Sequence, residues 1–267
     1  MIGIIILCLV LLFIYAPILI LAVYSFTDTA TIGTTGNFSL DNYVTLFTTP
    51  ELSEMIWGTL LLAFIAAVLA TILGTLGAIG TFYSKKRNQL AVNAVNQIPV
   101  VNADVVTGFS VCILLVVVFG ISKDSFFPLI AGHVTLCAPF VYLSVIPKLK
   151  QMDSSLYEAA LDLGASPAYA LRKVIIPQIL SGIVSGFAMA ITLSLDDYFI
   201  ATYTKPATFD TISTYVVNAT RGSQTEIKTA LWALSTLIFI IVLVIAILMN
   251  VHLKSQSNVT GKRGAQG

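Results

Sequence analysis

Three acidic residues, Asp104, Asp196 and Asp197, lie within or at the end of long apolar stretches of this sequence. A charged group at the centre of a bilayer costs at least about 2.5 kcal/mol, so such residues usually face a bundle interior or a water-filled path. No Lys or Arg falls within these stretches to neutralise the acids. A cationic substrate would supply the missing charge, and Tyr198 offers an aromatic face to an ammonium group. We therefore expect Asp104, Asp196, Asp197 and Tyr198 to line a substrate pathway.

The position of each acid along its expected helix supports this interpretation. Counting from Leu90 at about 1.5 Å per residue puts Asp104 roughly 21 Å along a helix, well inside a bilayer. Asp196 and Asp197 fall at the C-terminal end of another helix, where negative charge opposes the helix dipole, so capping does not explain them. Two alternatives stay open: Asp196 and Asp197 reach the outer water, or Asp104 bonds to nearby Asn or Ser groups.

A second candidate for function is the stretch Glu-Ala-Ala-Leu-Asp-Leu-Gly-Ala-Ser-Pro at 158–167, which separates two apolar runs. Ser155 is expected to cap a short helix, with Glu158 three residues on completing a capping box. Gly164 suits the left-handed position that ends such a helix. Ser166 followed by proline then starts a second helix, which we expect to run to Pro177.

The first of these two helices has a short apolar face made mostly of small residues, at helical spacing. Its members are Leu156, Ala159, Ala160 and Leu163. Such a face suits docking into a groove of another protein. The alternative is a helix lying on the lipid surface, but interfacial helices usually carry a Lys-rich polar face, whereas this one carries Glu158 and Asp162. The sequence therefore predicts a helical docking elbow at 148–177.

The sequence around these candidates is that of a membrane protein, because 57% of its 267 residues are hydrophobic and only 10% are charged. A transmembrane helix needs about 20 mostly apolar residues. Six stretches qualify, near residues 2–26, 57–82, 90–120, 126–147, 178–200 and 230–251. A transmembrane barrel would alternate apolar and polar residues, whereas Ile113 to Phe119 is apolar throughout. We expect an all-α membrane protein of about six transmembrane helices, forming one domain over 1–267.

The distribution of basic residues predicts the orientation of the chain. With the N-terminus inside, ten of the 14 Lys and Arg residues fall in inner loops and the tail, and four fall in outer loops. Cytoplasmic loops carry the excess of Lys and Arg, so both termini and the elbow are expected in the cytoplasm.

The remaining reactive residue types give little sign of metal or nucleotide chemistry. Cys8, Cys112 and Cys137 all lie in apolar runs and are expected to be small buried hydrophobes. His133 lacks a second histidine at metal spacing and is expected to be a hydrogen-bonded interior residue. No GxxxxGK[ST] phosphate-binding loop occurs, so ATP hydrolysis would require a separate subunit.

The run Glu158-Ala159-Ala160 followed by Gly164, with the ending 174–177, resembles the cytoplasmic loop motif of permease subunits of bacterial ABC importers. The similarity extends along nearly the whole chain. Stretches 38–43, 133–140 and 194–198 are most similar to the second permease subunit of spermidine/putrescine importers. One departure from the family pattern is Ala103, which precedes Asp104 where relatives often carry proline.

The resemblance implies a type I ABC importer permease in the bacterial inner membrane, passing a polyamine such as spermidine or putrescine into the cytoplasm. It implies three partners: an ATP-binding subunit, a second permease subunit and an extracellular or periplasmic substrate-binding protein. ATP would bind to the separate subunit, with no cofactor or metal in this chain. The residues implied to couple with the ATPase are Glu158, Ala159, Ala160, Leu163 and Gly164.

Other functions compete with this interpretation. A proton-coupled secondary transporter would use Asp104 or Asp196 as a titrating carrier and would need no ATPase. An ABC permease for iron or another cationic solute would keep the same fold and partners. An intramembrane aspartyl protease would pair Asp104 with Asp196 or Asp197, but nothing around these residues supports proteolysis.

Overall fold

The structure is a computed structural model of the chain, and it describes residues 2–28, 36–153, 155–221, 230–244 and 247. The described residues form helices and no strand, apart from a single antiparallel bridge between Thr27 and Phe38. The chain divides into two compact units, Met1–Trp57 with Thr214–Ile245, and Gly58–Ser213 with Ala246–Gly267.

The first unit is tied together by polar bonds at the end of its first helix. Its helices are α1 (Ile2–Ser25), α2 (Asp41–Thr48), the first residues of α3 (Pro50–Phe82), α11 (Ile212–Arg221) from Thr214 onward and the apolar helix Ala230–Val244. The Asn42 side-chain amide donates to the backbone carbonyls of Ser25 and Thr27, at 3.1 and 2.9 Å. These bonds fix the path from α1 to α2. The rings of Tyr24 and Trp232 meet edge to face at 5.5 Å.

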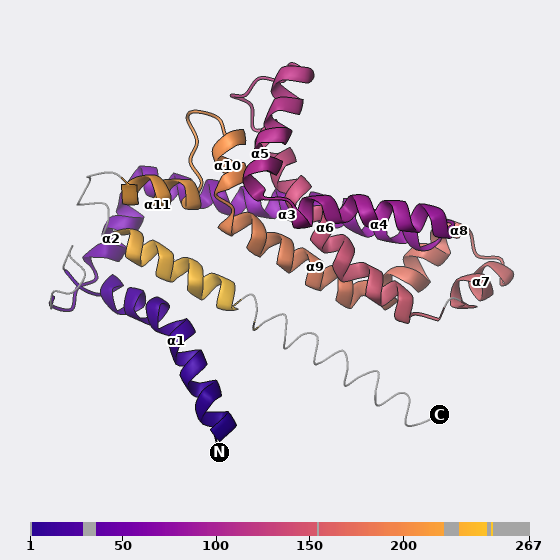
Figure 1. Cartoon of the computed structure of the whole chain (residues 1–267), viewed down its shortest axis with the longest axis horizontal. Helices are drawn as coiled ribbons and strands as arrows, with labels where there is room; N and C mark the ends of the chain where they lie inside the picture. The colour runs from indigo at the N-terminus through magenta and orange to yellow at the C-terminus, as the bar shows by residue number, and fades with distance from the viewer. Residues whose placement is uncertain (1, 29–35, 154, 222–229, 245–246, 248–267) are drawn as a thin grey trace. The chain divides into compact units, whose positions relative to one another are not determined.

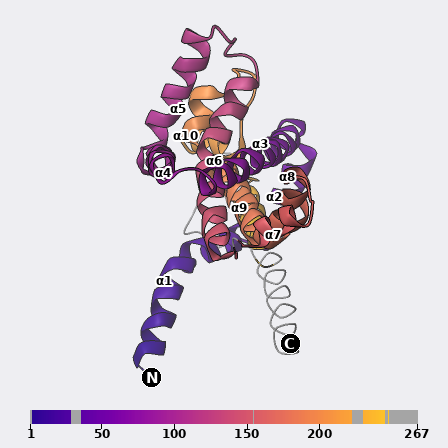
Figure 2. The same cartoon turned by 90° about the vertical axis from the view of Figure 1, so that its right-hand side faces the viewer.

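The second unit contains most of the candidate residues. Its helices are the rest of α3, α4 (Lys86–Val101), α5 (Asp104–Cys112), η1 (Ile113–Val118), α6 (Phe127–Gln151), α7 (Ser155–Asp162), α8 (Pro167–Ala170), η2 (Leu171–Ile175), α9 (Ile176–Asp196), α10 (Phe199–Thr204) and the start of α11 (Ile212–Arg221). Figures 1 and 2 show α9 running along α6, and α10 lying beside α5.

Small residues let the long helices of this unit approach closely. A Cβ atom at Gly182 of α9 would lie 2.9 Å from the Ser144 carbonyl oxygen, and one at Gly74 of α3 would lie 2.8 Å from that of Ala138. Real Cβ atoms do not approach backbone so closely, so both positions require glycine. Close packing through small residues is typical of helix pairs in membranes, where the hydrophobic effect does not drive helices together.

The three cysteines differ in their burial. Cys137 of α6 is buried, as the sequence predicts, whereas Cys112 is half-buried and Cys8 is exposed. The expectation of a buried residue is therefore wrong for Cys8, because it lies on α1, where many apolar side chains point outward.

The described residues contain four helices long and apolar enough to span a membrane, or five if α4 with α5 and η1 counts as one bent span. The expected third helix over 90–120 is not straight. It breaks at Asn102 and Ala103, where both backbones are extended, and its halves meet at 105°. The estimate of Asp104 as roughly 21 Å along one helix is therefore wrong. The sixth expected run, 230–251, lies partly outside the described residues.

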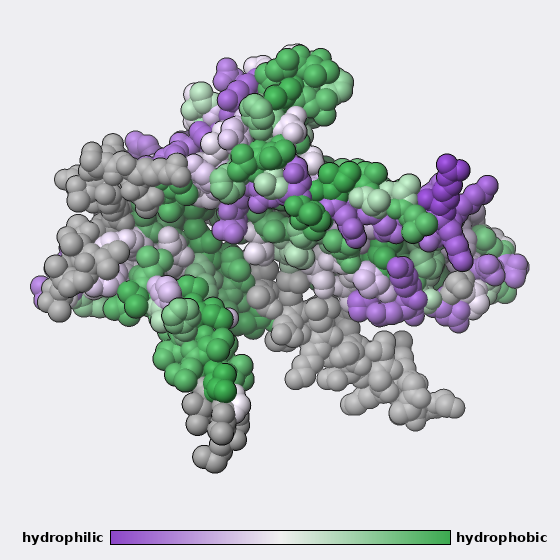
Figure 3. Space-filling view, in the orientation of Figure 1, coloured by the Kyte–Doolittle hydropathy of each residue, from purple (hydrophilic) through white to green (hydrophobic). Residues whose placement is uncertain are grey.

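Polar side chains collect at one end of the second unit. Figure 3 shows hydrophilic residues gathered where α4 begins and where α7 lies. Lys85, Lys86 and Arg87 precede or open α4, and Lys148 and Lys150 lie in the last turn of α6. All five were expected on the cytoplasmic side, and the structure brings them to the same end of the unit as the elbow.

Candidate functional site

The elbow begins with a cap that differs from the expected one. Ser155 is the first helical residue of α7, and its backbone N–H and hydroxyl both donate to Asp153 Oδ1, at 3.0 and 2.8 Å. These bonds, the backbone one foremost, stabilise the ionised carboxylate and lower the pKa of Asp153. The expected capping box of Ser155 with Glu158 is therefore wrong, because Ser155 is already the first helical residue and Asp153 accepts from the start of the helix in its place.

The end of α7 follows the sequence prediction. Gly164 has a φ of +84°, the left-handed conformation that glycine adopts without strain. Its N–H donates to the Leu161 carbonyl at 2.9 Å, and the N–H of Ala165 donates to the Ala160 carbonyl at 3.0 Å. This pair of bonds is the Schellman motif, which satisfies carbonyls that the helix end leaves free.

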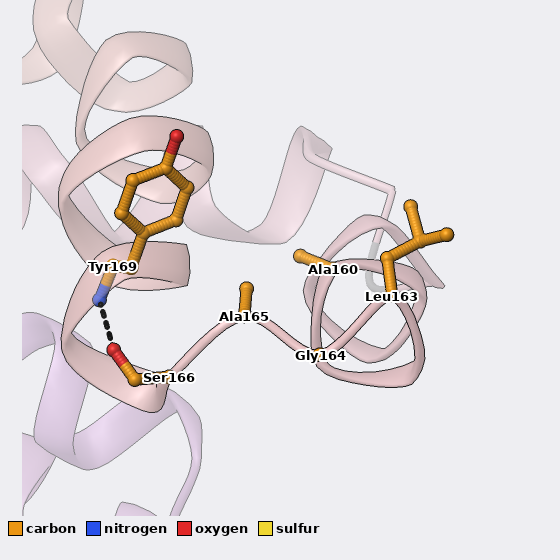
Figure 4. Close-up of a pocket in the computed structure, with 6 residues that line it drawn as sticks. All are labelled: Ala160, Leu163, Gly164, Ala165, Ser166 and Tyr169. Carbon is orange, nitrogen blue, oxygen red and sulfur yellow. Dashed lines mark hydrogen bonds between the residues drawn. The ribbon is translucent and has the colours of Figure 1, made fainter.

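The second helix of the elbow begins as predicted but does not end at Pro177. The Ser166 hydroxyl accepts the Tyr169 backbone N–H at 3.3 Å, as Figure 4 shows. From Pro167 the helix continues through the π-turn η2 into α9 as one 30-residue element. The second helix of the elbow is thus continuous with a helix long and apolar enough to span a membrane.

The elbow displays its apolar side chains outward. None of the described α7 residues is buried, and Leu163, just after this helix, is 89% exposed. A shallow groove of about 470 Å³ separates the end of α7 from α8. Its lining consists of Ala160, Leu163, Gly164, Ala165, Ser166 and Tyr169. Four of the five predicted coupling residues are uncharged and no larger than leucine: Ala159, Ala160, Leu163 and Gly164. Short side chains at these positions leave the backbone of the elbow accessible to another helix.

The second candidate site lies where α9 ends and α10 begins, here called the α9–α10 junction (Asp196–Phe199). Asp197 is buried, and both of its carboxylate oxygens accept backbone N–H groups of α10: Oδ1 that of Ile200 at 3.2 Å, and Oδ2 that of Ala201 at 2.8 Å. The view that capping does not explain Asp197 is therefore wrong. The chain turns after Asp196 and begins a new helix, so the carboxylate sits at a helix N-terminus, where negative charge is favourable.

His133 of α6 faces the same carboxylate. Its ring is fully buried, with Nδ1 2.9 Å from the Leu129 carbonyl oxygen and Nε2 3.7 Å from Asp197 Oδ2. The prediction of a hydrogen-bonded interior histidine is confirmed. Its acidic partner was missed, because the two residues lie in different helices and no local pattern joins them.

The other acidic pathway candidates lie close to this pair. Asp104 is exposed at the start of α5 and interacts electrostatically with Asp197. The two acids approach because α5 packs on α10, where the rings of Phe109 and Tyr203 meet edge to face at 5.6 Å. Asp196, the last residue of α9, is exposed. The structure thus brings Asp104 and Asp197 together, with Asp196 adjacent in the chain.

Tyr198 and the asparagines near Asp104 are held by contacts of their own. Tyr198 is partly buried and packs edge to face on Phe199 at 5.2 Å. Asn93 accepts the Tyr142 hydroxyl at 2.7 Å, and Asn102 donates to the Thr107 hydroxyl at 3.2 Å. These bonds join the two amides to a tyrosine and a threonine hydroxyl.

The chain is similar to known transport proteins. Residues 3–256 match the family described as binding-protein-dependent transport system inner membrane component. The spermidine/putrescine transport system permease protein PotC of Haemophilus influenzae is 33% identical over 237 residues, covering 88% of this chain and 90% of that protein. The putrescine transport system permease protein PotI of Escherichia coli is 33% identical over 236 residues, covering 85% and 81%.

Solved structures share the fold. A bacterial ABC transporter involved in the import of the acidic polysaccharide alginate matches with a TM-score of 0.72 at 20% identity, covering 94% of this chain and 92% of that one. The MetNI methionine ABC transporter in inward-facing form matches with a TM-score of 0.61 at 17% identity, covering 77% and 95%. The all-helical fold expected from the sequence, that of an ABC importer permease, is confirmed.

Proposed function

The chain belongs to the family of binding-protein-dependent transport system inner membrane components, and from that membership we propose that it is a permease subunit of an ATP-driven polyamine importer. It is a multi-pass membrane protein of the transport class rather than an enzyme. One observation carries the choice of substrate: Asp104 and Asp196 are exposed beside buried Asp197, and α5, α9 and α10, as bounded above, contain no basic residue. Two similar proteins are named for spermidine or putrescine.

Asp104 and Asp196 lie on different helices, an arrangement that suits a polyamine better than a metal ion. A metal ion needs several ligands around one point, and the part of the chain that the structure describes holds no group of three or more His, Cys, Asp or Glu residues able to bind one. A polyamine carries its charges along a flexible chain and can reach separate carboxylates. In the proposed pathway Asp104 and Asp196 attract the ammonium groups, more strongly where water is scarce, and Tyr198 contributes its ring face.

The elbow at 148–177 is proposed to dock into a separate ATP-binding subunit. The partner would seat on Ala159, Ala160, Leu163 and Gly164, with Glu158 at the edge of the contact. Because α8 continues into α9, movement of the elbow would reach the α9–α10 junction directly. The remaining partners would be a second permease subunit and an external substrate-binding protein. Both termini are proposed to be cytoplasmic, consistent with the ten basic residues of the inner loops and tail.

ATP-dependent uptake of labelled spermidine and putrescine tests this function. The chain would be co-expressed with its partner subunits in membrane vesicles, with Glu158 intact or replaced by lysine. We expect Glu158→Lys to abolish uptake, because it places a cation where the elbow presents an acid, while the subunits stay folded in the membrane. Asp124→Lys, a charge reversal at an exposed acid outside the elbow, is the matched control and should leave uptake unchanged.

The alternatives give different results in the same assay. Polyamine uptake that proceeds equally without the ATPase would contradict the importer and favour a proton-coupled secondary transporter. ATP-dependent uptake of another cation, undiminished by excess spermidine and putrescine, would keep the importer but change its substrate to a different cationic solute.

A further inference from the structure

We infer that His133 and Asp197 hold one proton between them, and that this neutral pair positions α10 against α6 while withdrawing the Asp197 carboxylate from substrate. His133 is thus a positioning residue, which acts through Asp197 and not on the transported molecule. Its effect on transport rests on the proposed function, whereas the shared proton does not.

The hydrogen-bond chemistry of the histidine ring carries the first step. A carbonyl oxygen only accepts hydrogen bonds, so the bond from His133 Nδ1 to the Leu129 carbonyl requires a proton on Nδ1. In a neutral ring Nε2 is then an acceptor, and it faces a carboxylate oxygen 3.7 Å away. Two acceptors facing each other in a buried site repel. One further proton, on either Nε2 or Asp197 Oδ2, turns the contact into an attraction.

The surroundings offer no other source of positive charge for Asp197 among the residues that the structure describes there. Asp104 from α5 is an acid, and the Cys137 thiol of α6 donates to the Ala190 carbonyl at 3.3 Å. Lys205, which follows α10, is paired with Asp210 at 3.0 Å. Within the described part of the chain, His133 Nε2 is also one of the few buried polar atoms without a hydrogen-bond partner. A shared proton satisfies both groups, and a buried charge without a partner is strongly unfavourable.

The pair acts at a point where α10 is tightly enclosed. Cβ atoms added at Gly108 of α5 and Gly132 of α6 would lie 2.8 Å from Ile200 Cα and 2.6 Å from Ile200 Cγ2. Asp197 caps α10 just before this contact, and His133 follows Gly132 in the sequence. The shared proton therefore stabilises the contact between the start of α10 and α6, within one helical turn of the close approach between Gly132 and Ile200.

The contacts of Asp197 also determine which of the three aspartates are accessible to a substrate. Asp197 is buried, each of its oxygens accepts a backbone N–H group, and Oδ2 also faces His133, so this carboxylate is turned toward the protein. Asp196 and Asp104 are exposed. The three aspartates thus divide their roles: Asp197 holds the structure, and Asp104 and Asp196 face the pathway.

A double-mutant cycle in the assembled transporter tests the coupling. We expect His133→Gln and Asp197→Asn each to lower spermidine uptake about tenfold, and the double variant to be no worse than the more damaged single one, because residues that share one contact are not additive. Asp124→Asn, at an exposed acid, is the control for the substitution itself. If Asp197 contacted substrate and His133 only filled the core, the losses would multiply to about a hundredfold, and the inference would be overturned.

Spectroscopy on the wild-type complex gives an answer that does not depend on uptake. The chain has two histidines, His133 and His252, so ¹⁵N-histidine labelling gives signals that the His133→Gln variant assigns. We expect one of two results: the ¹⁵N NMR signal of His133 shows a protonated Nε2, or the infrared spectrum shows a protonated carboxyl band that disappears in Asp197→Asn. An unprotonated Nε2 together with an ionised Asp197 at neutral pH would overturn the shared proton. Absent polyamine uptake with the expected spectra would instead contradict the proposed function alone.

Discussion

The elbow and the α9–α10 junction are both helix boundaries, yet they are built in opposite ways. In the elbow no described residue of α7 is buried, and the bonds that end this helix join residues a few positions apart, such as Ala165 to Ala160. At the junction Asp197 is buried, and besides its two local bonds to the start of α10 it contacts His133 of α6 and Ser213, whose hydroxyl donates to the Asp197 carbonyl. A locally determined structure keeps its shape when a partner binds or leaves, whereas one held by other helices changes when those helices move. The elbow therefore suits docking, and the junction suits control of a pathway.

This contrast predicts that damage at the junction spreads through the second unit. Gly108→Val would place a Cβ 2.8 Å from the Ile200 Cα, so backbone must shift. We expect a loss of about 1–3 kcal/mol in the free energy of unfolding, as for other overpacked cores. Thermal unfolding of the purified chain in detergent measures it.

The matched control is Gly80→Val, since a Cβ at Gly80 of α3 meets nothing within 4 Å. Equal melting temperatures for the two variants would mean that α10 is not enclosed between α5 and α6, and the contrast with the elbow would fail.

Damage at the elbow should instead stay local. Gly164→Ala forces a residue with a side chain into a φ of +84°, at a cost of about 1–2 kcal/mol. Because no described residue of α7 is buried, we expect faster amide hydrogen exchange in α7 with an unchanged global melting temperature.

Gly164→Asn is the conservative comparison, since asparagine tolerates the left-handed conformation better. A fall in the global melting temperature of Gly164→Ala as large as that of Gly108→Val would show that the elbow is part of the core.

The same contrast explains how much could be predicted from sequence. Gly164 and Ser166 were placed correctly because their roles depend on neighbours within five residues. The cap at Ser155 was misplaced, because Asp153, two residues earlier, accepts the first helical N–H of α7. The role of Asp197 could not be read at all: its cap requires a helix break that hydropathy does not mark, and its histidine lies in another helix.

The break before Asp104 gives the smallest predicted effect. Ala103 has a φ of −64° and a ψ of 135°, which are the values that proline adopts, and Asn102 before it is extended, as a residue before proline must be. No hydrogen bond from the Ala103 N–H is found among the described residues. We expect Ala103→Pro to raise the free energy of unfolding by about 0.4–1 kcal/mol, because proline restricts the unfolded chain, and to leave uptake unchanged.

Thermal unfolding and uptake of the Ala103→Pro variant measure both effects. Ala94→Pro is the matched substitution, because Ala94 is also exposed but lies inside α4, where proline removes a helical hydrogen bond and should lower the melting temperature. If Ala103→Pro destabilised the chain as Ala94→Pro does, the backbone at Asn102 and Ala103 would not be a fixed extended segment between α4 and α5. The bend before Asp104 would then be a mobile hinge, and the position of Asp104 in the proposed pathway would not be fixed by the backbone.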